Sequence, residues 1–132
     1  MHHSEIKAET RKLIADGTVL PAHPLALDAS RALDVRHQRA STRYYLDAGA
    51  GGLAVGVHTT QFAIRDVGLY RPVLELAAET AASWTERPVA MVAGLAGATR
   101  QAIAEAQTAR GIGYHAGPVS YTHLTLPTNR EV

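Results

Sequence analysis

The sequence predicts an α/β protein in which parallel strands alternate with helices that cover them. The chain reads as one helix, then strand and helix three times, then a further strand, an order typical of parallel sheets. The strand candidates at 53–55 and 89–93 are apolar throughout, as buried parallel strands are. Aromatic residues make up only 5% while Ala and Gly are abundant, which favours close helix-on-sheet packing. A (β/α)8 barrel and a doubly wound open sheet both fit, and 132 residues are about half of a barrel that needs roughly 250.

The first half of the chain supplies a helix, a strand and a second helix. The first helix is expected over 4–16, with Ser4 as its cap and Gly17 as its stop. A short strand over 18–22 follows and ends at two prolines. Asp28 is the expected N-cap of a second helix that runs to about residue 47, because an Asp side chain there can accept backbone N–H groups. The inward face of this helix is expected at steps of four, three and four, namely at Leu33, His37, Ala40 and Tyr44.

The second half of the chain repeats the alternation. Strand 53–55 leads into a loop, and a third helix begins near Pro72, where a missing backbone N–H costs nothing. Strand 89–93 leads through a glycine turn into a fourth helix that Thr99 caps. A last strand is expected within 114–119. Trp84, at the end of the third helix, is expected in the core or in an interface.

Composition excludes several classes of function. A formal net charge of +1 leaves no basic surplus for a nucleic-acid partner. The absence of cysteine excludes a disulfide framework and a thiolate metal site. No apolar run approaches the roughly 20 residues of a membrane span, and the N-terminus lacks the apolar middle of a signal peptide. We therefore expect a cytoplasmic protein with neither a nucleic-acid nor a membrane partner.

The character of the chain changes at residue 119. The stretch 119–132 has no glycine and no helical stripe, and it resembles the in-frame translation of a transposon-type sequencing adapter. We interpret it as a non-native tail and exclude it from the fold prediction. The alternative is a native strand over 120–126 followed by a short tail.

Two stretches carry a family resemblance. The first is GTVLPAHPLAL at 17–27, and the second ends in DAGAGGLAVGVHTTQ at 47–61. With the VAG at 92–94 and the helix after it, they resemble the dihydrodipicolinate synthase / N-acetylneuraminate lyase family over roughly residues 13–118, in a divergent branch. The resemblance implies that residues 1–118 form the N-terminal half of a (β/α)8 TIM barrel of aldolase type, with an extra N-terminal helix.

The resemblance also implies where substrate binds. After the second strand the family carries Gly-Thr-Thr-Gly-Glu, whose hydroxyls and N–H groups hold the substrate carboxylate and begin a proton relay. Here Thr59 and Thr60 are the implied catalytic residues. An ungapped alignment places His58 and Thr59 on the family's threonine pair, whereas a one-residue gap places Thr59 and Thr60 there. His58, Thr59, Thr60 and His23 are the implied substrate-binding residues, since His23 follows the first strand. The alternative for the threonines is a turn that their hydroxyls cap.

Other residues near these loops have weaker patterns. His23 and His58 would need a third ligand, Gln61 or Asp66, to hold a metal, and this spacing matches no recognised metal site, so none is expected. Arg65 and Asp66 fit an exposed pair at a helix start better than a carboxylate clamp. The glycine-bearing turn at 94–99 lacks the lysine of a phosphate loop.

The implied activity is that of a lyase or synthase that forms a Schiff base with pyruvate or a related 2-oxo acid and needs no cofactor. The chain has two lysines, Lys7 and Lys12, both ahead of the first strand, whereas the family's nucleophilic lysine lies on the sixth strand and its relay tyrosine on the fifth. We therefore expect the full-length protein to be a homo-oligomeric enzyme and this chain to be inactive. The alternatives are an anion-binding α/β module without turnover and a metal-dependent aldolase-type barrel. Half a barrel has open edges, so the chain is expected to be poorly soluble or to pair with a second copy.

Overall fold

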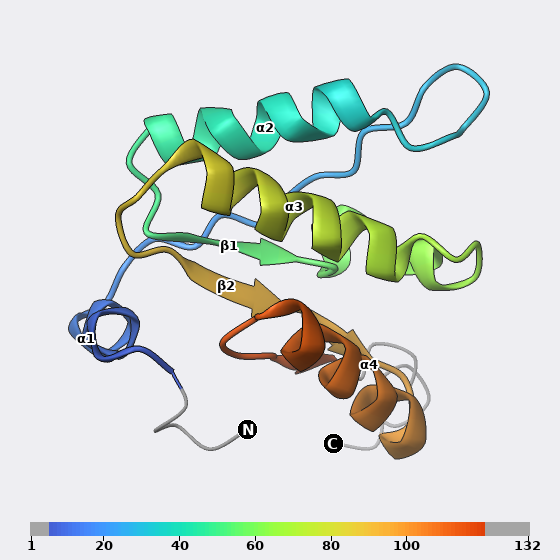
Figure 1. Cartoon of the computed structure of the whole chain (residues 1–132). Coiled ribbons are helices and arrows are strands. Elements are labelled where there is room, and N and C mark those ends of the chain that lie inside the picture. Colours follow the sequence, from blue (N-terminus) through green and yellow to red (C-terminus); the bar gives the residue numbers. More distant parts are fainter. Residues whose placement is uncertain (1–5, 121–132) are drawn as a thin grey trace, which may run out of the picture.

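The computed structural model of the protein describes residues 6–120, and it alternates helices and strands along the chain (Figure 1). Two of its helical segments, η2 and η3, are 3-10 helices. None of the helices in the described part is long and apolar enough to span a membrane. The elements in order are α1 (Ala8–Asp16), α2 (Val35–Asp47), β1 (Gly52–Val55), η2 (His58–Thr60), η3 (Phe62–Arg65), α3 (Tyr70–Trp84), β2 (Ala90–Ala93), β3 (Leu95–Ala96), α4 (Thr99–Ile112) and β4 (Val119–Ser120).

Four extended segments lie side by side and run in the same direction. β1 pairs with β2 in parallel over Gly52–Val55, and β3, which continues β2 after Gly94, pairs in parallel with β4. The segment 19–23 lies beside β1, where Ala22 forms a parallel bridge with Ala54. The strands therefore follow the order of the chain, and the predicted parallel α/β class is confirmed.

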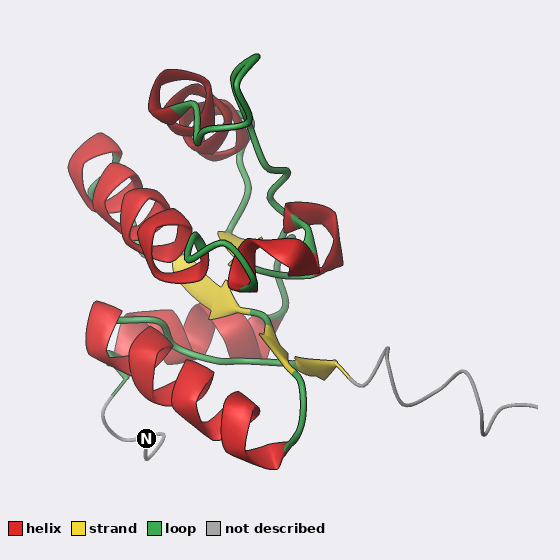
Figure 2. Ribbon diagram, turned by 90° about the vertical axis from the view of Figure 1, so that its right-hand side faces the viewer, coloured by secondary structure: helices red, strands yellow, loops and turns green. Residues whose placement is uncertain are grey.

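One hydrophobic cluster lies between these strands and the three helices α2, α3 and α4. Leu53 and Val55 of β1 are fully buried and face this cluster, as do Met91 and Ala93 of β2. The helices fan around one side of the strands (Figure 2). A sheet with its helices on one side, in chain order, is singly wound as in a barrel, since doubly wound sheets carry helices on both faces.

The first strand and the start of the second helix differ from the prediction. The segment 19–23 is extended but joins β1 through one bridge and two backbone hydrogen bonds, with a third from the N–H of Gly51 just before β1, rather than through a regular ladder. α2 begins at Val35, not after Asp28. Asp28 instead accepts hydrogen bonds from the N–H groups of Ser30 and Ala32, and Asp34 is the N-cap, accepting from the His37 N–H at 3.0 Å. Asp28 and Asp34 are both candidate caps. Asp34 is used because Asp28 belongs to a turn that the antiparallel bridge between Leu27 and Leu33 closes.

The inward face of α2 was predicted wrongly. His37, Ala40 and Tyr44 are not buried, and the residues that α2 buries are Gln38, Thr42 and Leu46. Two of these are polar, so a pattern based on apolar residues cannot find them. Their burial is explained by hydrogen bonds to the loop after the first strand, described below.

The remaining helix ends agree more closely with the sequence. Gly17 ends α1 and Gly113 ends α4, both with positive φ, and Pro72 lies in the first turn of α3. Thr99 is the first residue of α4 rather than its cap, which is Ala98 and forms no side-chain hydrogen bond. Ser4, the expected cap of α1, lies outside the described residues. Trp84 is 44% exposed, and its indole N–H donates to Asp47 of α2.

Candidate functional site

The loops that follow the strands at their carboxyl ends lie on one edge of the sheet. In parallel α/β folds this edge carries the binding and catalytic residues. Here it is formed by residues 23–26 after the first strand, 56–61 after β1, and 94–98 around β3 (Figure 1). α1 lies at the opposite, amino ends of the strands (Figure 1).

Thr60 joins the first two of these loops. Its side chain is fully buried, and its hydroxyl donates to the backbone oxygen of His23 at 2.6 Å. The hydroxyl oxygen in turn accepts from the N–H of Gly56 at 3.0 Å. Both of these hydrogen bonds are made to backbone groups. Thr60 thus ties the loop after β1 to the loop after the first strand.

His23 is buried and does not face solvent. Its Nδ1 lies 2.9 Å from the Pro24 carbonyl and its Nε2 lies 2.7 Å from the Thr42 hydroxyl. Nδ1 also lies 3.1 Å from the Gln38 side-chain nitrogen, and the direction of these ring hydrogen bonds depends on which ring nitrogen carries the proton. Burial lowers the pKa of His23 from 6.5, and the Pro24 hydrogen bond opposes this only partly. Gln38 completes the group by donating to the Pro24 carbonyl and accepting from the Ala26 N–H.

His58 and Thr59 are the exposed members of the predicted site. Both lie in the 3-10 turn η2, directly after β1, and the ring of His58 packs edge-on against Phe62 with centroids 5.5 Å apart. The turn is closed by bonds from the N–H groups of Thr60 and Gln61, so the N–H groups of His58 and Thr59 have no partner within it. The structure therefore separates the four predicted residues into an exposed pair, His58 and Thr59, and a buried pair, His23 and Thr60.

Arg65 is the residue that sequence reasoning placed wrongly. Its side chain is 9% exposed, as is that of Glu105 on α4, and its Nε lies 2.9 and 3.0 Å from the two carboxylate oxygens. Its Nη2 donates to the carbonyls of Gly56 and Gly94, each at 3.0 Å. Arg65 thus bridges the carboxyl ends of β1 and β2. Asp66 is exposed, as predicted.

Several neighbours complete the environment of Arg65. The guanidinium lies 4.6 Å from the ring centre of Tyr70, whose hydroxyl donates to the Gly94 carbonyl at 2.8 Å. Glu105 also accepts from the Ala96 N–H at 3.1 Å and from Gln101 at 2.9 Å. Burial, with the nearby charge of Glu105, raises the pKa of Tyr70 and keeps its hydroxyl protonated. The remaining guanidinium nitrogen of Arg65, Nη1, is buried without a hydrogen-bond partner in the described structure.

These contacts form one continuous path across three loops. It runs from Ala96 through Glu105 and Arg65 to Gly56, and from Gly56 through Thr60 to His23. The hydrogen bonds along this path restrain the loops that it connects. The exposed turn at His58 and Thr59 is therefore held on a fixed base. The pairing of Arg65 with Glu105 was missed because the two residues lie 40 positions apart and no local pattern joins them.

The residues that the structure describes include no group of potential metal ligands. Within residues 6–120, no three side chains of the ligating types lie close enough to hold a metal ion. His23 is buried with both ring nitrogens at hydrogen-bond distance from other groups, while His58, Gln61 and Asp66 are exposed.

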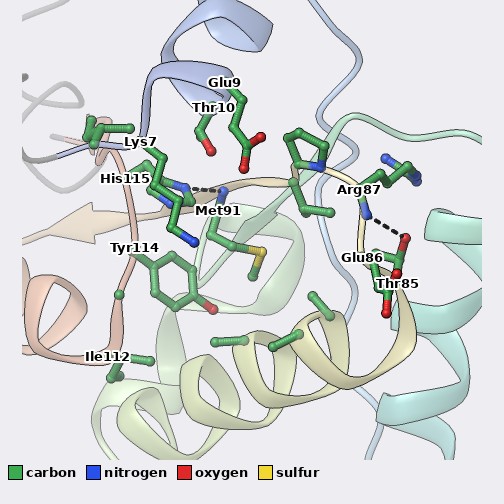
Figure 3. Close-up of a pocket in the computed structure, with 17 residues that line it drawn as sticks. Lys7, Glu9, Thr10, Thr85, Glu86, Arg87, Met91, Ile112, Tyr114 and His115 are labelled. Carbon is green, nitrogen blue, oxygen red and sulfur yellow. Dashed lines mark hydrogen bonds between the residues drawn. The ribbon is translucent and has the colours of Figure 1, made fainter.

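A hollow of about 460 Å³ lies at the opposite end of the strands, beneath α1 (Figure 3). Lys7, Tyr114 and His115 line it, and the Met91 N–H donates to Nδ1 of His115 at 3.0 Å. Lys12 is exposed and pairs with Asp16 on the same helix. Both lysines of the chain thus lie at the amino ends of the strands, away from His58 and Thr59.

These strands, helices and loops define part of a parallel β/α barrel, with an extra helix before its first strand. Solved structures bear this out. A putative dihydrodipicolinate synthetase from Pseudomonas aeruginosa matches with a TM-score of 0.69 and 21% identity, over 78% of this chain and 36% of its own. The CdNal protein of Clostridium difficile, solved in complex with mannosamine, matches with a TM-score of 0.69 and 17% identity over 77% and 34%. Dihydrodipicolinate synthase from Aquifex aeolicus matches with a TM-score of 0.68 and 19% identity over 84% and 39%.

The chain spans about a third of the length of these structures. At such identities the likeness establishes the fold, which is the N-terminal part of a TIM barrel as predicted. No family model matches the chain, and no curated protein sequence does.

Proposed function

We propose that this chain carries part of the active site of a Schiff-base lyase or synthase that acts on pyruvate or a related 2-oxo acid. In this proposal the turn at 57–61 binds the substrate carboxylate. The observation that carries it is the exposed pair His58 and Thr59 at the carboxyl end of β1, in a fold that matches dihydrodipicolinate synthases. The Thr59 hydroxyl and the first N–H groups of the turn are donors suited to an anionic carboxylate.

The buried residues have a different task in this proposal. Thr60 and His23 hold the turn in place, because the Thr60 hydroxyl bonds the backbone of both loops. Thr59 is then the first member of the proton relay that the family resemblance implies, and Thr60 positions it. The amine that attacks the carbonyl must be neutral and close to the bound substrate. Lys7 and Lys12 lie at the other ends of the strands, so the nucleophile belongs to a later strand of the barrel.

The first experiment is a titration of the isotope-labelled chain with pyruvate, followed by NMR. We expect shifts of the backbone amides of residues 57–61. Thr59→Val should weaken binding about tenfold or more, since a hydrogen bond to a charged group contributes roughly 1.5–3 kcal/mol. Thr18→Val is the matched control, because Thr18 is exposed and lies at the amino end of the first strand. Pyruvate-induced shifts elsewhere, or an unchanged affinity of Thr59→Val, would contradict the proposal.

The second experiment tests the position of the nucleophile. Borohydride reduction in the presence of pyruvate should leave this chain without a pyruvyl adduct on Lys7 or Lys12, as read by mass spectrometry of its peptides. A specific adduct on either lysine would mean that the chemistry lies at the amino ends of the strands and that the proposed site is misplaced.

A further inference from the structure

The hollow beneath α1 lies between several parts of the chain, at the opposite end of the strands from the proposed substrate site. Its lining comes from α1, the end of α3 with the loop 85–89, β2, and residues 112–115 (Figure 3). Its volume of about 460 Å³ is in the range of pockets that bind small molecules. The space stays open because the residues of α3 that line it are all alanines, namely Ala78, Ala81 and Ala82.

Thr10 of α1 brings a hydroxyl without a partner to this hollow. Thr10 is 4% exposed and lines the hollow, yet its hydroxyl forms no hydrogen bond with any residue between 6 and 120. Burying a hydroxyl without a partner costs free energy, and most buried polar side-chain atoms are hydrogen-bonded. The hydroxyl points away from α1 toward the hollow (Figure 3). A ligand in the hollow would therefore supply the missing acceptor.

Two further donors line the same hollow. The Met91 N–H donates to Nδ1 of His115 at 3.0 Å, so the neutral ring carries its proton on Nε2. Burial, together with the charge of Lys7, lowers the pKa of His115 from 6.5 and keeps the ring neutral at neutral pH. The Lys7 ammonium group forms no ion pair within the part of the chain that the structure describes, although it lines the hollow. An ammonium group, a ring N–H and a hydroxyl together suit an anionic acceptor.

Glu9 limits the charge that the hollow can accept. Its carboxylate extends from α1 toward the hollow (Figure 3) and balances the charge of Lys7. The other charged residues of the lining, Glu86 and Arg87, lie on the side away from Lys7, and Arg87 donates to the Leu46 carbonyl at 2.7 Å. A dianion such as phosphate would therefore meet no excess of positive charge. The donors suit a group with one negative charge.

We propose that this hollow binds a small organic acid that carries one carboxylate and an aliphatic chain. The carboxylate accepts from the Thr10 hydroxyl, the Lys7 ammonium group and Nε2–H of His115. The chain packs against Met91, Ile112 and the alanines of α3, in a lining that is mostly apolar, as ligand pockets are. The inference depends on the hollow alone and is independent of the proposed substrate.

Titration of the isotope-labelled chain with hexanoate, followed by NMR, tests this site. We expect shifts of the backbone amides of residues 7–10, 91 and 112–115, and none at 57–61. Lys7→Met should weaken binding about tenfold or more, because it removes the charge and keeps an apolar stem. Lys12→Met is the matched control, since Lys12 lies on the same helix, pairs with Asp16 and does not line the hollow. Equal effects of the two substitutions, or shifts confined to other residues, would overturn the proposal.

Chain length separates a formed pocket from general attraction to a lysine. Each CH₂ group added between butanoate and hexanoate should tighten binding about fourfold, because it is buried in the hollow. Equal affinities for the two acids would refute an aliphatic subsite. Pyruvate has one methyl group and should bind here far more weakly than hexanoate. The two sites are read by different amides, so this inference and the proposed function can fail separately.

Two further variants test the carboxylate end of the hollow. Thr10→Val should weaken hexanoate binding about fivefold without lowering the free energy of unfolding, because the hydroxyl has no hydrogen bond to lose in the free chain. Glu9→Gln should tighten binding, because it removes a negative charge beside the bound carboxylate. Parental affinity in Thr10→Val, or weaker binding in Glu9→Gln, would contradict the proposed contacts.

Discussion

Arg65 and Glu105 form a buried ion pair between the loop after β1 and the middle of α4. The Nε of Arg65 lies 2.9 and 3.0 Å from the two carboxylate oxygens, and each side chain is 9% exposed. The same guanidinium donates to the carbonyls of Gly56 and Gly94. The pair thus connects two neighbouring strand ends with the helix that follows them. It holds the base from which the exposed turn at His58 and Thr59 projects.

Glu105→Gln should destabilise the chain strongly. The substitution keeps the shape of the side chain but leaves a buried guanidinium without its counter-charge, which costs about 3–5 kcal/mol. Urea unfolding followed by circular dichroism measures the free energy of unfolding.

Glu79→Gln is the matched control for this prediction. Glu79 pairs with Arg39 at 3.0 Å, but the two side chains are 67% and 39% exposed. An exposed pair contributes about 0–1 kcal/mol, so this variant should unfold almost as the parent does. Equal effects of the two substitutions would mean that the Arg65–Glu105 pair is exposed to solvent in solution.

The order of elements was predictable from the sequence because it depends on local composition. The buried strands are continuous apolar runs, and glycines with positive φ end α1 and α4, as at Gly17 and Gly113. These signals are read from neighbouring residues and do not require knowledge of the tertiary fold. The helix boundaries that were wrong, at Asp28 and Thr99, are places where several residues can cap.

The candidate site was predictable only in part, for a physical reason. The turn at 57–61 follows a strand, so its place on the sheet edge comes from the order of elements. The burial of Gln38, Thr42 and Arg65 depends on partners 12 to 40 positions away, which local periodicity does not detect. Burying a charged or polar side chain costs free energy unless it is hydrogen-bonded, and the hydrogen bonds to these distant partners offset that cost.

Thr60→Val and Thr59→Val should have very different consequences for stability. Valine at position 60 fills the same space but leaves the Gly56 N–H and the His23 carbonyl without their partner, and an unpaired buried group costs about 1–3 kcal/mol. Thr59 is exposed, so its substitution should change the free energy of unfolding by less than about 0.5 kcal/mol. Denaturant unfolding gives both values. A stability loss at Thr59 larger than at Thr60 would reverse the roles assigned to them.

The stability of the chain should fall as the pH drops from about 7.5 to 5. Burial lowers the pKa of His23 below 6.5, and burial together with Lys7 lowers that of His115. The unfolded chain therefore binds more protons than the folded chain between each lowered pKa and 6.5, and protons favour unfolding in this window. The melting temperature measured across this pH range gives the dependence.

Replacing the two histidines tests the origin of this pH dependence. His23→Gln should flatten the curve while lowering stability at pH 8, and a further His115→Gln should flatten it more. The carboxyls of Asp28 and Asp34, whose pKa values are lowered by hydrogen bonds, lose their contribution only below about pH 4. A slope between pH 7.5 and 5 that persists in the double variant would assign it to other groups.

Gly94→Ala and Gly111→Ala should change stability in opposite directions. A Cβ on Gly94 would lie 2.4 Å from the Gly56 carbonyl oxygen, which Arg65 also contacts, so the two strand ends would have to separate. Gly94→Ala should therefore lower the free energy of unfolding by more than about 2 kcal/mol, as overpacking against backbone does. Gly111 lies within α4 with nothing within 4 Å of a Cβ, and it does not have positive φ. Alanine at position 111 should raise the free energy of unfolding by about 0.5–1 kcal/mol. Urea unfolding of both variants gives the signs, and a neutral Gly94→Ala would show that the strand ends are not in close contact.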